Sequence, residues 1–236
     1  MEGLETIKAN SRETRTPFFN NNGSQERELK GKSLIGIVDN YVVIDIETTG
    51  LDVSCDEIIE VAAAKVEEGI IVKKFTSLIK PEKEINAFIT DLTGITNEMV
   101  ATAPTAENVL QDFVNFIGSG LIIGHNVNFD INFLYDNCQE KIGYTFSNDF
   151  LDTLRLSRML FGKERQHKLS DLIKRFGIGQ VVEHRALGDV LQTQRCYEYM
   201  LGYGIDNGVK MRHLYGSGRR KKKENIASNM DSLFGE

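Results

Sequence analysis

The chain has 236 residues, 41% of which are hydrophobic, and it carries a formal net charge of −6 at pH 7. This apolar fraction is typical of globular domains, and no run of about eighteen apolar residues offers a transmembrane helix. The three cysteines stand far apart without a C-x-x-C pair, so we expect neither disulfides nor a zinc ribbon. The first residues have no apolar leader, and both observations suit a protein of the reducing cytoplasm. Taken alone, the negative charge argues against nucleic acid as a partner.

Three segments of the chain differ in character. Residues 1–32 are polar, include the tract Asn20–Ser24 and predict a flexible arm. Residues 33–205 alternate apolar and polar patterns and predict one domain. Residues 206–236 hold the basic run Arg219–Lys223 and predict a disordered tail. The formal net charges of the three segments are +1, −10 and +3, so the negative charge belongs to the domain.

Within the domain, β-branched apolar runs predict strands and amphipathic patterns predict helices. The predicted strands are 41–46, 58–66, 70–79 and 121–123, with a hairpin turn at 67–69. The predicted helices are 104–117, with Pro104 in its first turn, 131–138, 151–160, 170–176, with Ser170 as N-cap and Gly177 as its stop, and 184–201. This order predicts an α/β domain with a mixed sheet flanked by helices.

Two acidic residues, Asp45 and Glu47, stand at the end of the first predicted strand. Because side chains alternate along a strand, both carboxylates face one side, while Ile44 and Ile46 face the other layer. Neighbouring carboxylates repel, so a cation is expected between them, and oxygen ligands favour magnesium or manganese. The alternative is a solvated strand end, since a single D-x-E triplet is expected by chance.

Two later segments add further candidates. Residues 124–130 form a predicted loop that ends at Asp130, which stands where a helix N-cap would, and a simple capping role is the alternative. Residues 184–189 place His184 and Asp189 at the start of the last predicted helix, where a histidine without a task is the alternative. Together, four carboxylates and a histidine could hold two divalent cations, which clamp both oxygens of an in-line phosphoryl displacement.

In this order and spacing, the motifs resemble those of the DEDDh-type 3′–5′ exonucleases of the DnaQ-like family, which includes the proofreading epsilon subunit of bacterial DNA polymerase III. The resemblance covers residues 40–201. It rests on VVIDIETTG (42–50), LTGIT (92–96), IIGHNVNFD (122–130), DTLRLSR (152–158), HKLSDL (167–172) and HRALGD (184–189). It implies an RNase H-like fold and hydrolysis of the terminal phosphodiester at a 3′ end, with release of 5′-mononucleotides.

The resemblance also implies roles for single residues. Asp45, Glu47, Asp130 and Asp189 would bind two Mg²⁺ or Mn²⁺ ions, and His184 would be the general base. The residues alone do not select this histidine, because His125 also precedes an aspartate by five positions. Asp152 would be structural. The residues implied to lie near the terminal nucleotide are Ile46, Thr48, Thr49, Gly50, His125 and Phe129.

Partners follow from the charge distribution. Two bound divalent ions would add +4 and reverse the sign that a phosphate meets. Residues 163–175 carry a net charge of +3 and are a candidate contact for the nucleic-acid backbone, unless they form only a solvated helix face; Arg185 is a second candidate. Residues 230–234 loosely resemble peptides that dock into sliding clamps, although the initial Gln of such peptides is missing.

The expected function is therefore a metal-dependent 3′–5′ exonuclease that acts on DNA with a free, single-stranded 3′ end in proofreading, repair or end trimming. Either a DNA polymerase or a sliding clamp is a candidate protein partner through the C-terminal tail. An RNA-trimming exonuclease stays open, because the motifs do not reveal how the 2′-hydroxyl is read. A non-catalytic module that binds nucleic acid or a polymerase is the alternative of another class, and the intact set of five residues argues against it.

Overall fold

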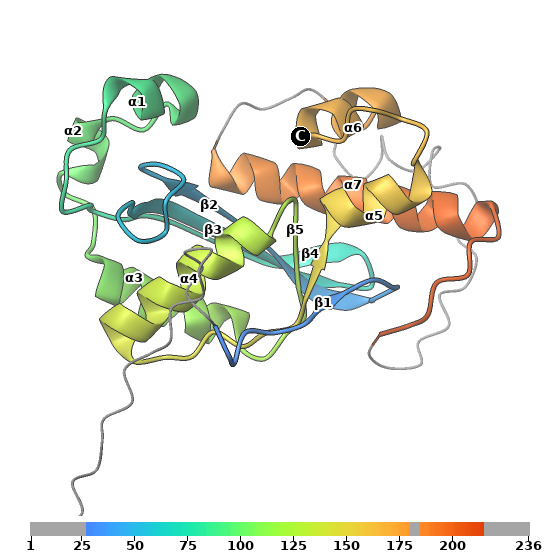
Figure 1. Cartoon of the computed structure of the whole chain (residues 1–236), viewed down its shortest axis with the longest axis horizontal. Coiled ribbons are helices and arrows are strands. Elements are labelled where there is room, and N and C mark those ends of the chain that lie inside the picture. The colour runs from blue at the N-terminus through green and yellow to red at the C-terminus, as the bar shows by residue number, and fades with distance from the viewer. Residues whose placement is uncertain (1–26, 180–184, 215–236) are drawn as a thin grey trace, which may run out of the picture.

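A computed structural model describes residues 27–179 and 185–214, which form a mixed six-stranded sheet with helices on both faces (Figure 1). The strand order is β1-β6-β5-β2-β3-β4, in which β2, β3 and β4 are antiparallel and the remaining neighbours are parallel. The strands are β1 (Ser33–Leu34), β2 (Asn40–Thr48), β3 (Ile58–Glu67), β4 (Ile70–Leu78), β5 (Ile122–Gly124) and β6 (Phe150–Asp152). The predicted α/β class with a mixed sheet is confirmed.

Two layers of helices cover the sheet (Figure 1). One face packs against α3 (Ala106–Ile117) and α4 (Asn128–Ile142). The other packs against α5 (Thr153–Leu160), α6 (Leu169–Phe176) and α7 (Ala186–Asp206). A smaller apolar cluster joins α1 (Ala87–Thr93) and α2 (Asn97–Val100) to the sheet. Within the described ranges, none of the helices has the length and apolar character needed to cross a membrane.

The alternation along β2 decides which layer each side chain meets. Ile44 and Ile46 lie in the cluster with α3 and α4, as the alternation predicts, whereas Tyr41 and Val43 lie in the cluster with α7. The next residues in the second series are Asp45 and Glu47. Strand alternation therefore directs both carboxylates toward the layer that contains α7.

The hairpin between β3 and β4 turns where it is predicted. Glu68 and Gly69 both have positive φ angles, of 50° and 82°. Such turns match the right-handed twist of the two strands, and glycine adopts this conformation without the strain that a side chain imposes.

Several helix and strand boundaries differ from the predictions. Residues 151–160 are not one helix, because residues 150–152 form β6 and pair with β5 before α5 begins. Pro104 precedes the N-cap Thr105 instead of lying in the first turn of α3. Ser170 lies inside α6, whose N-cap is Lys168. Gly177 does end that helix, with a φ of 64°.

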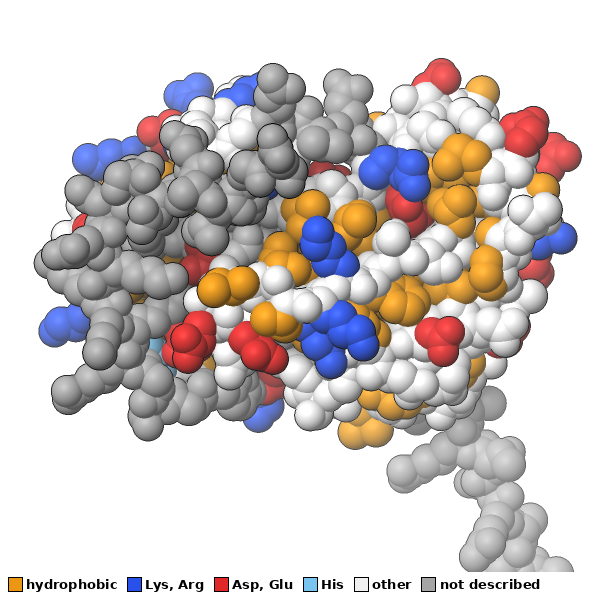
Figure 2. All heavy atoms as spheres, turned by 180° about the vertical axis from the view of Figure 1, so that it is seen from behind, with side chains coloured by type: hydrophobic (Ala, Val, Ile, Leu, Met, Phe, Trp, Pro, Cys, Tyr) orange, Lys and Arg blue, Asp and Glu red, His pale blue; other side chains and the backbone are white. Residues whose placement is uncertain are grey.

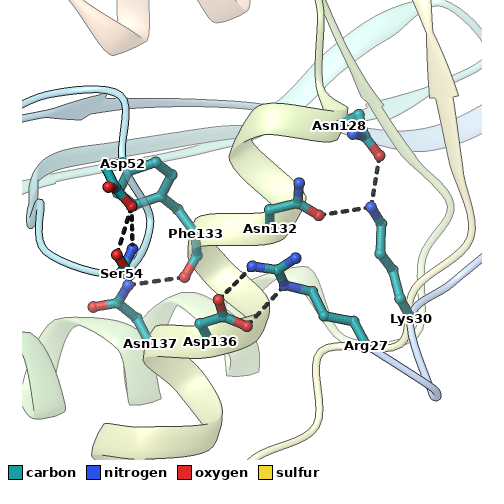
Figure 3. Close-up of polar contacts among 9 residues, drawn as sticks. All are labelled: Arg27, Lys30, Asp52, Ser54, Asn128, Asn132, Phe133, Asp136 and Asn137. Atoms are coloured by element: carbon teal, nitrogen blue, oxygen red, sulfur yellow. Dashed lines mark hydrogen bonds and ion pairs between the residues drawn. The ribbon is translucent and has the colours of Figure 1, made fainter. Parts of the chain in front are cut away.

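Residues on both sides of the predicted domain, 33–205, contact it. Arg27 forms a two-pronged ion pair with Asp136 of α4, and Lys30 Nζ donates hydrogen bonds to Oδ1 of Asn128 (2.6 Å) and Asn132 (2.7 Å) (Figure 3). At the other end, the Leu214 backbone nitrogen donates to the Ile37 carbonyl at 2.9 Å. Residues 27–32 and 207–214 thus contact the domain, whereas the rest of the predicted arm and tail lies outside the described residues.

Candidate active site

Three carboxylates from two distant parts of the sequence meet at the end of β2. Asp45 and Glu47 project from β2, and Asp189 comes from the first turn of α7; one ligand atom from each lies within 4.8 Å of the others. All three side chains are half-buried. The structure therefore brings together three of the four predicted metal ligands.

The fourth predicted ligand, Asp130, reaches the same region from the opposite helical layer. It is the third residue of α4, whose N-cap position is Val127, so the suggested capping role is wrong. Its carboxylate is buried and accepts a hydrogen bond of 3.1 Å from the backbone nitrogen of Ile46, which lies between Asp45 and Glu47 in the chain. Asp130 is thereby held beside the strand that carries the other two acids.

The electrostatics of these acids favour a bound cation. Burial, followed by the charges of Asp130 and Asp189, raises the pKa of Asp45 well above its ordinary value. Burial likewise raises the pKa of Asp130, and burial and the charge of Asp189 raise the pKa of Glu47 to about 8. Crowded, buried carboxylates resist ionisation unless positive charge offsets them. A set of hard oxygen donors under this repulsion fits divalent ions such as Mg²⁺ or Mn²⁺.

His184, the predicted general base, lies outside the described residues; the chain is described again from the next residue, Arg185. This arginine is exposed, so the suggested contact with a phosphate stays a prediction, but its guanidinium also forms an ion pair within the domain. Its Nη2 and Nε donate to Glu60 Oε1 (2.7 Å) and Oε2 (3.1 Å). Glu60 is not among the predicted site residues, although a glutamate inside the apolar run of β3 is an unusual feature that signals a special role.

The segment after β2, predicted to meet the terminal nucleotide, is held by internal hydrogen bonds. Thr48 Oγ1 donates to the Gly50 carbonyl at 2.6 Å, and Thr49 Oγ1 accepts from the Glu57 backbone nitrogen at 2.9 Å. A Cβ on Gly50 would lie 2.3 Å from the carboxylate of Asp56, so any other residue there would displace the Asp56 side chain. The following turn is closed by Asp52, which accepts two hydrogen bonds from Ser54 (Figure 3).

The remaining predicted nucleotide contacts differ in exposure. The Ile46 side chain is buried in the apolar cluster, and Phe129 packs against the same cluster with its ring centroid 4.8 Å from that of Phe133. His125 Nδ1 is 3.0 Å from Thr153 Oγ1, and burial lowers the pKa of His125 to about 4. Asp152 caps α5 and also accepts from the Asn126 backbone nitrogen, which fixes the loop that carries this histidine. The contacts with a nucleotide stay predictions.

The basic segment 163–175 is only partly available for a ligand. Arg175 donates to the Gln166 carbonyl at 2.7 Å and pairs with Glu164 at 3.6 Å, so it stabilises its own segment. Lys163, Arg165 and Lys168 are exposed. On the face turned away from Figure 1, basic side chains lie among apolar and acidic ones and form no continuous basic surface on the part that is described (Figure 2).

Comparison with known proteins assigns the chain to a family. Residues 42–197 match the family model of RNase T, whose description is exonuclease. The chain belongs to this exonuclease family. DNA polymerase III subunit epsilon of Aquifex aeolicus is 38% identical over 179 residues, which cover 74% of this chain and 89% of that protein. The family suggested by the motifs is thus confirmed.

Other relatives are much longer. DNA polymerase III PolC-type of Thermotoga petrophila is 39% identical over 157 residues, which are 66% of this chain and 11% of that protein. The chain therefore spans about a tenth of this relative. Among solved structures, exonuclease X in complex with 5′ overhanging duplex DNA matches with a TM-score of 0.55 and 25% identity, covering 72% of this chain and 95% of that one. This match confirms the predicted exonuclease fold.

Proposed function

We propose that this chain is a metal-dependent 3′–5′ exonuclease that hydrolyses the terminal phosphodiester of DNA and releases 5′-mononucleotides. The observation that carries the proposal is the convergence of Asp45, Glu47 and Asp189, whose ligand atoms lie within 4.8 Å of one another. Membership of the exonuclease family and the likeness to a DNA-bound exonuclease support the same reaction.

The four carboxylates are the proposed ligands of two Mg²⁺ or Mn²⁺ ions. Asp45 and Glu47 supply them from β2, Asp130 from α4 and Asp189 from α7. When bound, such ions would supply electrostatic stabilisation of the attacking and leaving oxygens in a phosphoryl displacement. The pKa values of Asp45, Glu47 and Asp130 are raised, so ionising these side chains is unfavourable. A bound cation would favour their ionised forms.

His184 is the proposed general base, on the strength of the family motif HRALGD. It takes a proton from the attacking water as the new bond forms between that oxygen and the terminal phosphorus. The bond from this phosphorus to O3′ of the preceding nucleotide breaks, and O3′ takes up a proton to become the new 3′ end. A histidine suits this task because it exchanges a proton near neutral pH.

A side-by-side degradation assay tests both the reaction and the substrate. Single-stranded DNA, a duplex with a mispaired 3′ end and RNA are offered, with Mg²⁺ and with EDTA. We expect Mg²⁺-dependent release of 5′-mononucleotides from the single-stranded and mispaired DNA ends. Degradation of RNA alone would instead support an exoribonuclease, and DNA binding without any turnover would support a non-catalytic module.

Single substitutions test the ligand assignment. Asp45→Asn and Asp189→Asn each remove a charge from the cluster while keeping the size of the side chain, so turnover should be abolished. Asp206→Asn, at the exposed end of the helix that carries Asp189, is the matched control and should leave turnover unchanged. Unchanged turnover in either cluster variant would refute the assignment.

A polymerase or clamp partner is a weaker extension of this proposal. Relatives that are named as polymerase subunits or PolC-type polymerases support a place beside a DNA polymerase. Leu233 and Phe234, the apolar residues of the suggested clamp-docking peptide, lie outside the described residues. A pull-down with purified clamp, comparing the wild type with Leu233→Ala/Phe234→Ala, tests it, and equal retention would end the idea. The cytoplasmic location stays a prediction.

A further inference from the structure

A buried glutamate that the proposed reaction does not use lies beside the acidic cluster. Glu60, on β3, is opposite Glu47 of β2 in the strand register and is only 2% exposed. Both of its oxygens accept hydrogen bonds from the start of α7. Besides the three hydrogen bonds from Arg185, Glu60 accepts one at Oε2 from the backbone nitrogen of Ala186 at 3.1 Å. A carboxylate buried this deeply is tolerated because each oxygen is paired with charge or with a backbone donor.

These contacts supply what α7 lacks in its own sequence. The first backbone N–H groups of a helix have no partner within the helix, and they attract negative charge. Arg185 occupies the N-cap position and its side chain makes no capping hydrogen bond. Glu60 therefore caps this helix from another element, and the guanidinium of Arg185 ties the same point to β3 in a fixed, two-pronged geometry.

The capped end of α7 is the part that carries a proposed metal ligand. The backbone nitrogen of Asp189 donates to the carbonyl of Arg185 at 3.1 Å, so the two residues are joined through the first turn. A series of hydrogen bonds thus links Glu60 through Arg185 to Asp189, whose carboxylate lies with those of Asp45 and Glu47.

We propose that Glu60 and Arg185 form a positioning pair that sets where Asp189 stands relative to Asp45 and Glu47. The pair would thereby control divalent-ion binding and turnover without either residue touching the ion or the reacting phosphate. This inference rests on the proposed function in that the acidic cluster is taken to bind metal.

Three variants of the full chain separate positioning from general stability. Glu60→Gln keeps the shape of the side chain and removes its charge. Arg185→Lys keeps the positive charge and removes the two-pronged contact. The matched control is Asp136→Asn, which disrupts an arginine–carboxylate pair of similar geometry, Arg27 with Asp136, on α4. For each variant, Mn²⁺ affinity is measured by calorimetry without DNA, kcat and KM are measured on single-stranded DNA, and hydrogen exchange is followed over residues 185–192.

Groups that orient metal ligands typically change metal affinity or activity by about 10- to 100-fold when they are removed. We therefore expect Glu60→Gln to weaken Mn²⁺ binding and to lower kcat by about tenfold or more, with KM little changed and with faster exchange at the start of α7. Arg185→Lys should show a smaller loss of the same kind. The control should keep the kcat and the Mn²⁺ affinity of the wild type even where its melting temperature falls.

Mn²⁺ affinity and kcat within twofold of the wild type in Glu60→Gln would overturn the inference, as would equal losses in Asp136→Asn. Should Glu60→Gln fail to fold, Arg185→Lys decides by the same criterion. A wild type that binds Mn²⁺ but does not degrade nucleic acid would reject the proposed function, and the Mn²⁺ and exchange comparisons would still decide the role of Glu60.

Discussion

In the absence of divalent ions, the free energy of unfolding of the domain should fall as the pH rises from about 6 to about 8. A carboxylate whose pKa is lowered by folding has the opposite effect, since it adds stability as the pH rises. Glu47 shows why. Its pKa is raised from 4.5 to about 8 in the folded chain, first by burial and then by the charge of Asp189. A group whose pKa is raised by folding stabilises the folded state below its unfolded pKa. That contribution is lost as the pH rises toward the folded pKa.

The size of the effect follows from the two pKa values of Glu47. Between them, the unfolded chain has released the proton and the folded chain retains it, so each pH unit costs about 1.4 kcal/mol of the free energy of unfolding. From pH 6 to pH 8 this amounts to about 2–3 kcal/mol, which for a domain of this size lowers the melting temperature by about 5–10 °C. The pKa values of Asp45 and Asp130 are raised as well, so they act in the same direction.

Bound ions should reverse this trend, because a cation favours the ionised carboxylates and competes with protons. At a concentration about 100 times its Kd, Mg²⁺ adds about 2.7 kcal/mol of stability, and the apparent affinity rises as the carboxylates lose their protons. The stabilisation by Mg²⁺ should therefore grow with pH. The assay is thermal unfolding, followed by circular dichroism at a series of pH values in EDTA and in excess Mg²⁺.

Two variants make this test decisive. Glu47→Gln has no proton to lose, so in EDTA its melting temperature should fall less steeply with pH than that of the wild type and should be higher near pH 8. Glu84→Gln, at an exposed position, is the control and should follow the wild-type curve. The reasoning is refuted if the wild-type melting temperature in EDTA stays level or rises over this range, or if both variants follow the same curve.

Three further predictions concern other parts of the chain. His184→Ala should lower kcat by about 10²- to 10⁴-fold while calorimetry shows Mn²⁺ affinity close to that of the wild type, and a large loss of affinity would contradict its role as a base. Arg27→Met should reduce stability in chemical denaturation by about 1 kcal/mol, because its ion pair joins residue 27 to α4, and an unchanged midpoint would show that this contact contributes nothing. Replacing Lys163, Arg165 and Lys168 together by alanine should raise KM at constant kcat and make DNA binding less dependent on salt concentration. An unchanged salt dependence would show that residues 163–175 do not contact the DNA backbone.

Much of the fold could be predicted because its signals are local. The β3–β4 hairpin has a long apolar run, a turn with glycine and a second segment that begins with β-branched residues, and α3 has one continuous apolar stripe, so local patterns identify all three elements. β1 and β6 escape prediction because their two and three residues are too few to show a period and, unlike those of β5, include no β-branched apolar pair. What makes residues 150–152 a strand is their pairing with β5 and β1, which no local pattern reveals.

Some features of the candidate site could also be predicted from local sequence, whereas others depend on contacts between distant residues. The shared face of Asp45 and Glu47 follows from strand alternation and could be predicted from the residues themselves. The place of Asp130 could not, because its position is fixed by a hydrogen bond to Ile46, 84 residues away in the sequence. Glu60 and Arg185 are 125 residues apart, so neither residue signals the other before the chain folds.

The acidic charge that first argues against nucleic acid is explained by how the cluster is built. Four carboxylates approach one another from β2, α4 and α7, where burial and mutual repulsion make their ionisation costly. Arg185 offsets part of the charge near Glu47, yet its guanidinium is already committed to Glu60. Since that arginine is shared, the proposed cations would supply the remaining positive charge that the cluster needs for full ionisation. Four of the acidic residues behind the net charge of −10 in residues 33–205 are these proposed ligands, and a phosphate at the site would meet the sum of their charges and those of the ions.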